Sequence, residues 1–153
     1  MVNSRVICLG EILWDCLAER SGRSLEEVES WTPYPGGAPA NVACALVKLG
    51  TSAAFIGAVG RDDDGNSLVQ LLQEVGVDVR GVQKHPTAPT RLIYVLRSPT
   101  GEPQFAGFGQ RQSNEFADTH LLAGQIPEDL FEEADFLVAG RSEERRVGKE
   151  CRS

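Results

Sequence analysis

The sequence predicts an α/β fold built on a doubly wound, mostly parallel sheet. Three short apolar runs, at residues 6–10, 53–60 and 136–140, have the composition of strands that are buried on both faces. Between the first two runs and after the second, segments 39–49 and 62–75 place apolar residues at helical spacing. The order strand, helix, strand, helix, strand is typical of parallel β-α-β units.

The N-terminal elements are expected as follows. The first strand runs on from its apolar core to Asp15, and the polar residues 19–30 are irregular. Residues 31–37 are rich in Pro and Gly, which predicts turns. A helix then begins near Pro39, because a missing N–H costs nothing in a first turn, and it ends at Gly50.

The second half of the pattern adds an antiparallel element to this sheet. A second helix follows Asp62 and ends at Gly76. Residues 91–110 form two β-rich segments around a Pro- and Gly-containing turn, which indicates a β-hairpin. A short helix over 127–134 leads to the last strand.

Charge and composition exclude several classes of function. The net charge of −7 argues against nucleic acid or an anionic membrane as a partner, since both require a basic surface. No run of 18 apolar residues exists, so no membrane span is expected. The cysteines, which are Cys8, Cys16, Cys44 and Cys151, show no CxxC or zinc spacing, and we expect reduced thiols in a cytoplasmic protein.

The C-terminal segment differs from the rest of the chain. Residues 141–153 read R-S-E-E-R-R-V-G-K-E-C-R-S, dense in charge and without a hydrophobic period. A natural, solvated tail has this composition, but the run resembles one translated frame of a sequencing adapter. We therefore expect 141–153 to be non-native, residues 1–140 to be a partial domain, and the natural protein to continue with a C-terminal half that is absent here.

One motif carries a resemblance to a known family. The run G-G-A-P-A-N-V-A over residues 36–43, with Gly50 and Gly60 at set distances, resembles the first signature of the ribokinase-like (PfkB) carbohydrate kinases. Residues 57–65 resemble the G-x-x-G-x-D-x-x-G run of the same family. The resemblance covers residues 5–140 in order and implies a ribokinase-like fold with a small β lid.

Four residues near this motif are candidate sugar ligands. Gly36 and Gly37 allow the backbone to approach a ligand, just before a helix N-terminus whose N–H groups face outward. Asn41 offers both a donor and an acceptor, as sugar hydroxyls require. Asp15 is expected at the carboxyl end of the first strand, where open α/β sheets bind ligands, and the resemblance implies that it holds sugar hydroxyls. Without the signature, the same residues indicate only a strand-to-helix turn.

The resemblance also implies a lid, from about 16–35 and 86–112, that covers the sugar and excludes water. Phe105 and Arg111 are further substrate-binding candidates there, although ordinary strand packing and a surface arginine explain them equally well. Some members of the family pair through the lid, which raises the expectation of a homodimer.

The implied activity is transfer of the ATP γ-phosphate to a sugar hydroxyl. Residues 10–15 and 105–108 resemble the fructokinase branch, so fructose is the expected substrate and fructose 6-phosphate the product. A 2-keto-3-deoxygluconate kinase and a non-catalytic sugar-binding half-domain are the alternatives. The family's catalytic Asp, in a D-T-x-G-A-G-D motif, and its ATP and magnesium residues are absent. No catalytic or metal residue is therefore assigned, and this fragment is expected to be inactive.

Other site types are excluded by spacing. No G-K-[ST] follows the glycine pair, so it is not a P-loop, and no G-x-G-x-x-G follows the first strand. An EF-hand loop over the acidic run at 62–64 would place Leu71 where Glu is required. His85 and His120 have no partner at ligand spacing and are interpreted as surface residues.

Overall fold

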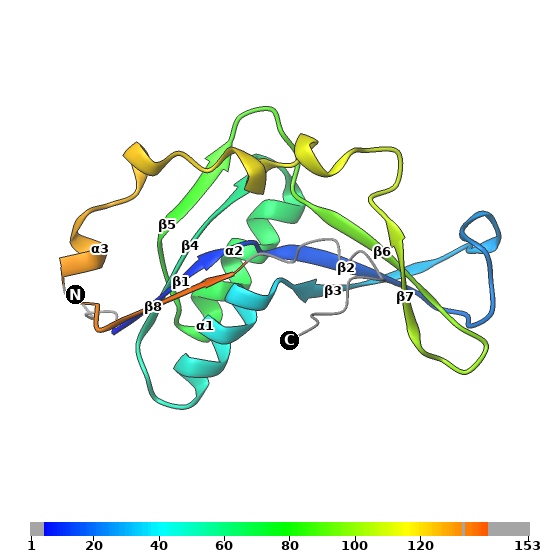
Figure 1. The fold of residues 1–153 in the computed structure, drawn as a ribbon, viewed down its shortest axis with the longest axis horizontal. Helices are drawn as coiled ribbons and strands as arrows, with labels where there is room; N and C mark the ends of the chain where they lie inside the picture. The colour runs from blue at the N-terminus through cyan, green and yellow to red at the C-terminus, as the bar shows by residue number, and fades with distance from the viewer. Residues whose placement is uncertain (1–4, 133, 141–153) are drawn as a thin grey trace, which may run out of the picture.

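A computed structural model describes residues 5–132 and 134–140, and the expected non-native segment 141–153 lies outside them. Within these residues the chain forms two four-stranded sheets (Figure 1). The parallel sheet has the order β5-β4-β1-β8, formed by Asp78–His85, Ala53–Gly60, Val6–Gly10 and Phe136–Gly140. The second sheet has the order β3-β2-β6-β7, formed by Trp31–Gly36, Leu13–Ala18, Leu92–Arg97 and Pro103–Gly107.

The parallel sheet is covered on both faces. Helices α1 (Ala38–Lys48) and α2 (Asp63–Val75) pack on one face, where Phe55 is fully buried. On the other face, Ile56 packs with Leu130 of the short helix α3 (Asp129–Glu132). Because side chains alternate along a strand, β4 is buried over its whole length. All neighbouring strands of this sheet are parallel, which confirms the predicted doubly wound arrangement.

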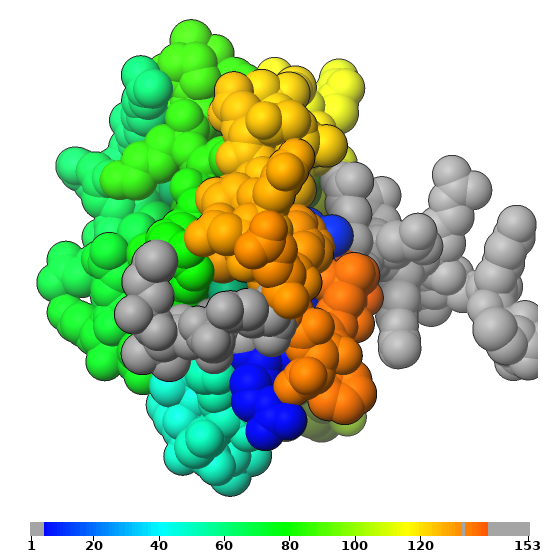
Figure 2. Space-filling view, turned by 90° about the vertical axis from the view of Figure 1, so that its left-hand side faces the viewer, coloured from blue at the N-terminus to red at the C-terminus, as the bar shows by residue number. Residues whose placement is uncertain are grey.

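A band of irregular chain crosses the α3 face of this sheet. It contains the 3-10 helices η3 (Ala117–His120) and η4 (Ala123–Gln125), and the remaining two 3-10 helices of the described residues are η1 (Leu25–Glu27) and η2 (Ser113–Glu115). Figure 2 shows this band, yellow to orange, running beside the green part of the surface. It connects the second sheet back to β8.

The predicted boundaries of α1 and α2 are confirmed and have local causes, whereas the helix predicted over 127–134 begins only at Asp129 and has ended by residue 134. Helix α1 carries Pro39 in its first turn, and Gly50 just beyond its end has φ +89°. Helix α2 begins at Asp62, whose side chain accepts a hydrogen bond of 2.8 Å from the amide of Gly65. It ends at Gly76 in the left-handed conformation. The predicted hairpin is also present as β6 and β7.

Two N-terminal expectations were wrong. The first apolar run does not continue to Asp15, because β1 ends at Gly10 and the chain then crosses to the second sheet, where β2 begins at Leu13. A side chain at Gly10 would overlap the carbonyl of Gly140, so the chain passes close to β8 at this point. Residues 31–36 form strand β3 in place of turns, since an edge strand tolerates prolines.

The second sheet is mixed and more open to solvent. Strand β2 pairs with β3 in antiparallel and with β6 in parallel orientation. Every residue of β6 is only half-buried, whereas β4 is fully buried. Figure 1 shows this sheet extending away from the helices. Among the described residues, no helix has the length and apolar character that a membrane crossing requires.

Candidate functional site

The carboxylate of Asp15 lies against the backbone of Gly36. In the β2–β3 pair, Asp15 is opposite Tyr34 and Leu13 is opposite Gly36, so Asp15 and Gly36 are diagonal neighbours. A Cβ at Gly36 would overlap Oδ2 of Asp15. Glycine is therefore required at this position to leave room for the acid.

Gly37 turns the chain from β3 into α1. It is the residue before the helix, it has φ +101°, and a Cβ there would overlap the carbonyl of Glu11. The backbone N–H of Asn41 donates a hydrogen bond of 2.9 Å to the carbonyl of Gly37. The structure thus brings Gly36, Gly37 and Asn41 to one helix N-terminus, with the Asp15 carboxylate beside it.

Asp15 is located differently from the sequence expectation. It lies inside β2 of the second sheet, and not at the carboxyl end of the first strand. Its side chain is half-buried and makes no hydrogen bond or ion pair with any described residue. Burial raises the pKa of this carboxyl above its usual value. A half-buried acid without a protein partner is suited to accept hydrogen bonds from a ligand.

The G-x-x-G-x-D-x-x-G run forms a link between the two sheets. One oxygen of Asp62 accepts hydrogen bonds from the Gly65 amide (2.8 Å) and the Thr90 hydroxyl (2.6 Å), and the other accepts from the Thr90 amide (2.8 Å). The Gly60 amide donates to the Thr90 hydroxyl oxygen at 3.0 Å. Thr90 precedes β6, so Asp62 joins the start of α2 to the base of the hairpin.

These hydrogen bonds also change the acidity of Asp62. Burial is the largest single effect and opposes ionisation, but the bonds from Thr90 and Gly65 together outweigh it and lower the pKa of the carboxyl. A second contact of α2 with the second sheet lies nearby, where the indole N–H of Trp14 donates to the carbonyl of Asp64 at 3.2 Å.

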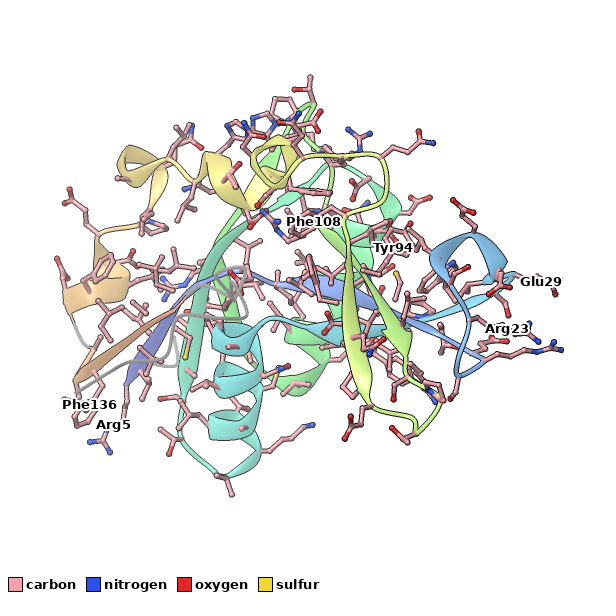
Figure 3. The ribbon with its side chains drawn as sticks, turned by 45° about the vertical axis from the view of Figure 1, so that its right-hand side comes forward. Arg5, Arg23, Glu29, Tyr94, Phe108 and Phe136 are labelled. Carbon is pink, nitrogen blue, oxygen red and sulfur yellow. The ribbon has the colours of Figure 1, made fainter. Side chains whose placement is uncertain are left out.

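The two candidates from the hairpin region contact residues of that region. Phe105 on β7 is 58% exposed, and its ring packs edge-on against Phe108 at 5.4 Å between centroids. Arg111 is exposed beyond β7, and its amide donates to the carbonyl of Phe108 at 3.4 Å. Within the described residues neither side chain pairs with Asp15, so both remain predictions as sugar ligands. Figure 3 labels Phe108 beside the hairpin.

Comparison with known families agrees with this arrangement. Residues 3–149 match the family described as pfkB family carbohydrate kinase. The chain belongs to this family. The matched range contains the Gly36–Gly37 pair, Asp62 and both sheets, and it extends into the segment 141–153.

Individual pfkB relatives are similar over most of this chain. "Probable fructokinase-5" of Arabidopsis thaliana is 40% identical over 135 residues, which cover 88% of this chain and 40% of the relative. Fructokinase-2 of Zea mays is 35% identical over 151 residues, covering 99% and 43% of the two chains. The solved fructokinase of Xylella fastidiosa aligns with a TM-score of 0.77 at 30% identity, covering 90% and 41%. The chain therefore spans about 40% of the length of these relatives.

A buried ion pair outside the pfkB signature was missed by sequence reasoning. Nε of Arg91 donates to both oxygens of Asp118, at 3.1 and 2.9 Å, and the two side chains are only 6% and 4% exposed. The guanidinium also donates to the carbonyl of Ser113 and lies over the rings of both Phe108 and Phe116, 5.1 and 4.8 Å from their centroids. The pair closes the base of the hairpin. Its members are 27 residues apart, so no local pattern could have revealed it.

The sequence did not indicate that His85 and His120 contact each other. The rings of His85, at the end of β5, and His120, in η3, have centroids only 4.9 Å apart. Their separation in the sequence concealed this contact. They lie beside the parallel sheet and do not pair with Asp15 in the described structure.

Proposed function

We propose that this chain supplies the sugar-binding surface of an ATP-dependent sugar kinase. The observation that carries the proposal is the half-buried Asp15 carboxylate, which has no partner among the described residues and rests against Gly36 beside the α1 N-terminus. A carboxylate accepts two charge-assisted hydrogen bonds from a sugar diol. The pfkB family membership supports a sugar as the ligand and a hydroxyl as the phosphate acceptor.

The neighbouring groups would complete the recognition of the sugar. Asn41 would donate to one hydroxyl and accept from another, since an amide side chain does both. The free N–H groups of the first turn of α1 would stabilise negative charge near the glycine pair. The second sheet, with Phe105 and Arg111 near its hairpin, would cover the sugar and exclude water.

Fructose is the substrate that we propose, with fructose 6-phosphate as the product. Support comes from relatives that carry the name fructokinase in Arabidopsis thaliana, Zea mays and Oryza sativa, at 35–40% identity to this chain. The solved fructokinases of Xylella fastidiosa and Halothermothrix orenii, each 30% identical, add structural support. No relative with a 2-keto-3-deoxygluconate name supports the alternative among those compared.

ATP would supply the phosphoryl group, and magnesium would accompany it. Support comes from a 30% identical fructokinase solved with bound ATP and a 27% identical relative solved with ATP and magnesium. The described residues contain no group of three or more His, Cys, Asp or Glu side chains suited to hold a metal ion. We therefore propose that the catalytic base and the residues for ATP and magnesium belong to a longer protein, and that this chain alone is inactive.

The test combines gene sequence and activity. The source gene would be sequenced across codon 140 and beyond, and the encoded protein assayed for ATP-dependent phosphorylation of fructose, ribose and 2-keto-3-deoxygluconate. We expect an open frame encoding a D-T-x-G-A-G-D-like motif, turnover of fructose above the other sugars, and none by this chain alone. A stop codon directly after codon 153 would instead favour a stand-alone sugar-binding protein.

We also propose a cytoplasmic location and a homodimer that forms through the second sheet. Cys8, Cys16 and Cys44 are free thiols in the described structure, as a reducing compartment would keep them. Tyr34 and Phe105 expose 48% and 58% of their surface on that sheet, which offers apolar area for pairing. Light scattering of the wild type and of Phe105→Ser tests the dimer, because only the variant should be monomeric.

A further inference from the structure

A cavity of about 670 Å³ opens at the carboxyl ends of β4 and β5. These parallel strands end side by side, with Gly60 paired to His85, and the amide of Arg61 donates to the carbonyl of His85 at 3.0 Å. The opposite wall comes from η3 and the residues up to η4. In Figure 1 this end of the sheet lies at the top, away from the junction of β3 and α1. The crevice beyond the carboxyl ends of parallel strands is where open α/β sheets bind ligands.

The wall of the cavity offers hydrogen-bond donors and a guanidinium. Arg61, Lys84, His85 and His120 line it, and none of its described lining residues is Asp or Glu. The nearby Asp62 is already engaged by Thr90 and Gly65. In a chain with a net charge of −7, a wall with a guanidinium, imidazole donors and no lining acid favours an anionic ligand.

The donors are held in place by the surrounding structure. Nδ1 of His85 accepts hydrogen bonds from the backbone N–H groups of Thr87 and Ala88, at 3.2 and 2.8 Å. Nε2 therefore carries the ring proton and acts as a donor. Lys84 supplies no such donor, because Nζ donates to Oδ1 of Asn66 on α2 at 2.7 Å, on the face of β5 opposite to Gln83 and His85.

A two-point clamp holds the opposite wall. Nε2 of Gln83 donates to the carbonyl of Leu122 at 2.8 Å, while the amide of Leu122 donates to Oε1 of Gln83 at 2.9 Å. This clamp attaches the segment that contains His120 to β5. It keeps the two imidazole rings in contact across the cavity.

We propose that this cavity binds the phosphate group of a small organic phosphate, at a place separate from Asp15 and the glycine pair. A guanidinium and imidazole N–H groups are donors that bind phosphate oxygens, the guanidinium through charge-assisted hydrogen bonds. The volume is within the usual range for small-molecule sites and exceeds what a bare phosphate needs. The inference does not depend on which sugar the protein phosphorylates.

The histidine rings provide a direct readout, because the sequence has two histidines and both line the cavity. The full chain would be titrated with inorganic phosphate, and separately with fructose 6-phosphate and glucose 6-phosphate, at constant pH and ionic strength. Histidine ring proton signals would be followed by NMR. We expect both ring signals to shift and saturate, with a phosphate ester binding more tightly than inorganic phosphate. Equal affinities would show that the cavity takes free phosphate and overturn the organic ligand.

Matched charge variants make the test specific. Arg61 and Lys84 are exposed, so Arg61→Gln and Lys84→Gln should fold normally. Arg61→Gln should weaken phosphate binding roughly tenfold, whereas Lys84→Gln, which removes an ammonium on the α2 face of β5, should have little effect. The control is Arg23→Gln, an exposed arginine at the outer end of the second sheet (Figure 3), which should bind as the wild type does. The proposal is overturned if the ring signals do not move, or if they move equally in all three variants.

Discussion

The two sheets of this chain differ in what they bury and in what they offer to a ligand. In the parallel sheet, β4 is buried over its whole length and Phe55 has no exposed surface. In the second sheet, β6 is half-buried throughout, and Phe105 on β7 is 58% exposed. The unpartnered Asp15 carboxylate belongs to the second sheet. Stability is therefore concentrated in the parallel sheet, and the carboxylate proposed to hold the sugar lies in the second sheet.

Because Asp15 lies in the more exposed sheet, its position depends on the contacts that hold that sheet against the rest of the fold. Asp62 joins the start of α2 to Thr90, and Arg91 joins the base of the hairpin to Asp118. Both contacts lie at the base of the hairpin, at the two residues directly before β6 begins in the second sheet. They determine where the second sheet, and with it Asp15, is held relative to the α1 N-terminus.

The largest expected difference between the sheets is in core packing. Phe55→Ala should lower the free energy of unfolding by about 3–5 kcal/mol, because it leaves a cavity in the fully buried face of β4. The matched substitution Phe105→Ala in the second sheet should change it by about 0.5 kcal/mol or less. Urea unfolding measures both. Equal losses in the two variants would contradict the division of stability between the sheets.

The next largest effect is expected at the hairpin base. Arg91→Met should lower the free energy of unfolding by about 3 kcal/mol, because it leaves the carboxylate of Asp118 buried without its partner. The double variant Arg91→Met, Asp118→Leu should recover much of this loss, since no charge then remains buried. Thermal unfolding of the three proteins forms the test. A double variant less stable than Arg91→Met would show that the pair acts in another way.

Asp62→Asn should lower the free energy of unfolding by about 1–2 kcal/mol, because Asp62 caps α2 and also accepts hydrogen bonds from Thr90. Its pKa is lower in the folded protein than in the unfolded chain, so the stabilising effect is complete above the unfolded value and is lost as the pH falls through the folded value. The stability difference between wild type and Asp62→Asn should therefore be constant near neutral pH and shrink below about pH 4. Asp63→Asn, at an exposed position in the same turn, should show little of either effect.

Gly36→Ala should have a small effect on stability, about 1 kcal/mol, and a large effect on sugar binding. The new Cβ would take the place of Oδ2 of Asp15, and the flexible acid would move away. Gly124→Ala is the control, because a Cβ there meets no other atom within 4 Å. Sugar titrations of both variants are informative. Normal affinity in Gly36→Ala would mean that the position of Asp15 does not matter.

Sequence patterns predicted the parallel sheet better than the second sheet, for a physical reason. A strand buried on both faces, such as β4, is apolar at every position, and that pattern is local. The sheet to which Asp15 belongs, by contrast, depends on pairing with β3 and β6, which the local run 6–15 does not encode. Pro33 and Pro35 indicated turns because the edge position of β3 was unknown.

In the candidate site too, the sequence predicted what a local pattern encodes and missed what depends on distant segments. Gly36, Gly37 and Asn41 share one short segment, so a motif revealed them together. The reason for Gly36, which is the Asp15 carboxylate beside it, required the pairing of two strands. The Arg91–Asp118 pair and the contact between the histidine rings depend wholly on distant segments.

Sugar binding to this chain and to Asp15→Asn is the most direct measurement of the central claim. The variant should be as stable as the wild type or slightly more stable, since burial raises the pKa of Asp15 and its charge is unfavourable in the fold. Fructose should shift backbone NMR signals at Asp15, Gly36 and Asn41 of the wild type, less strongly as the acid becomes protonated at low pH.

Asp15→Asn should lose this response, while Glu29→Gln, at the outer end of the second sheet in Figure 3, should retain it. A response to fructose that is the same in Asp15→Asn as in the wild type would contradict the assignment of this carboxylate to the sugar.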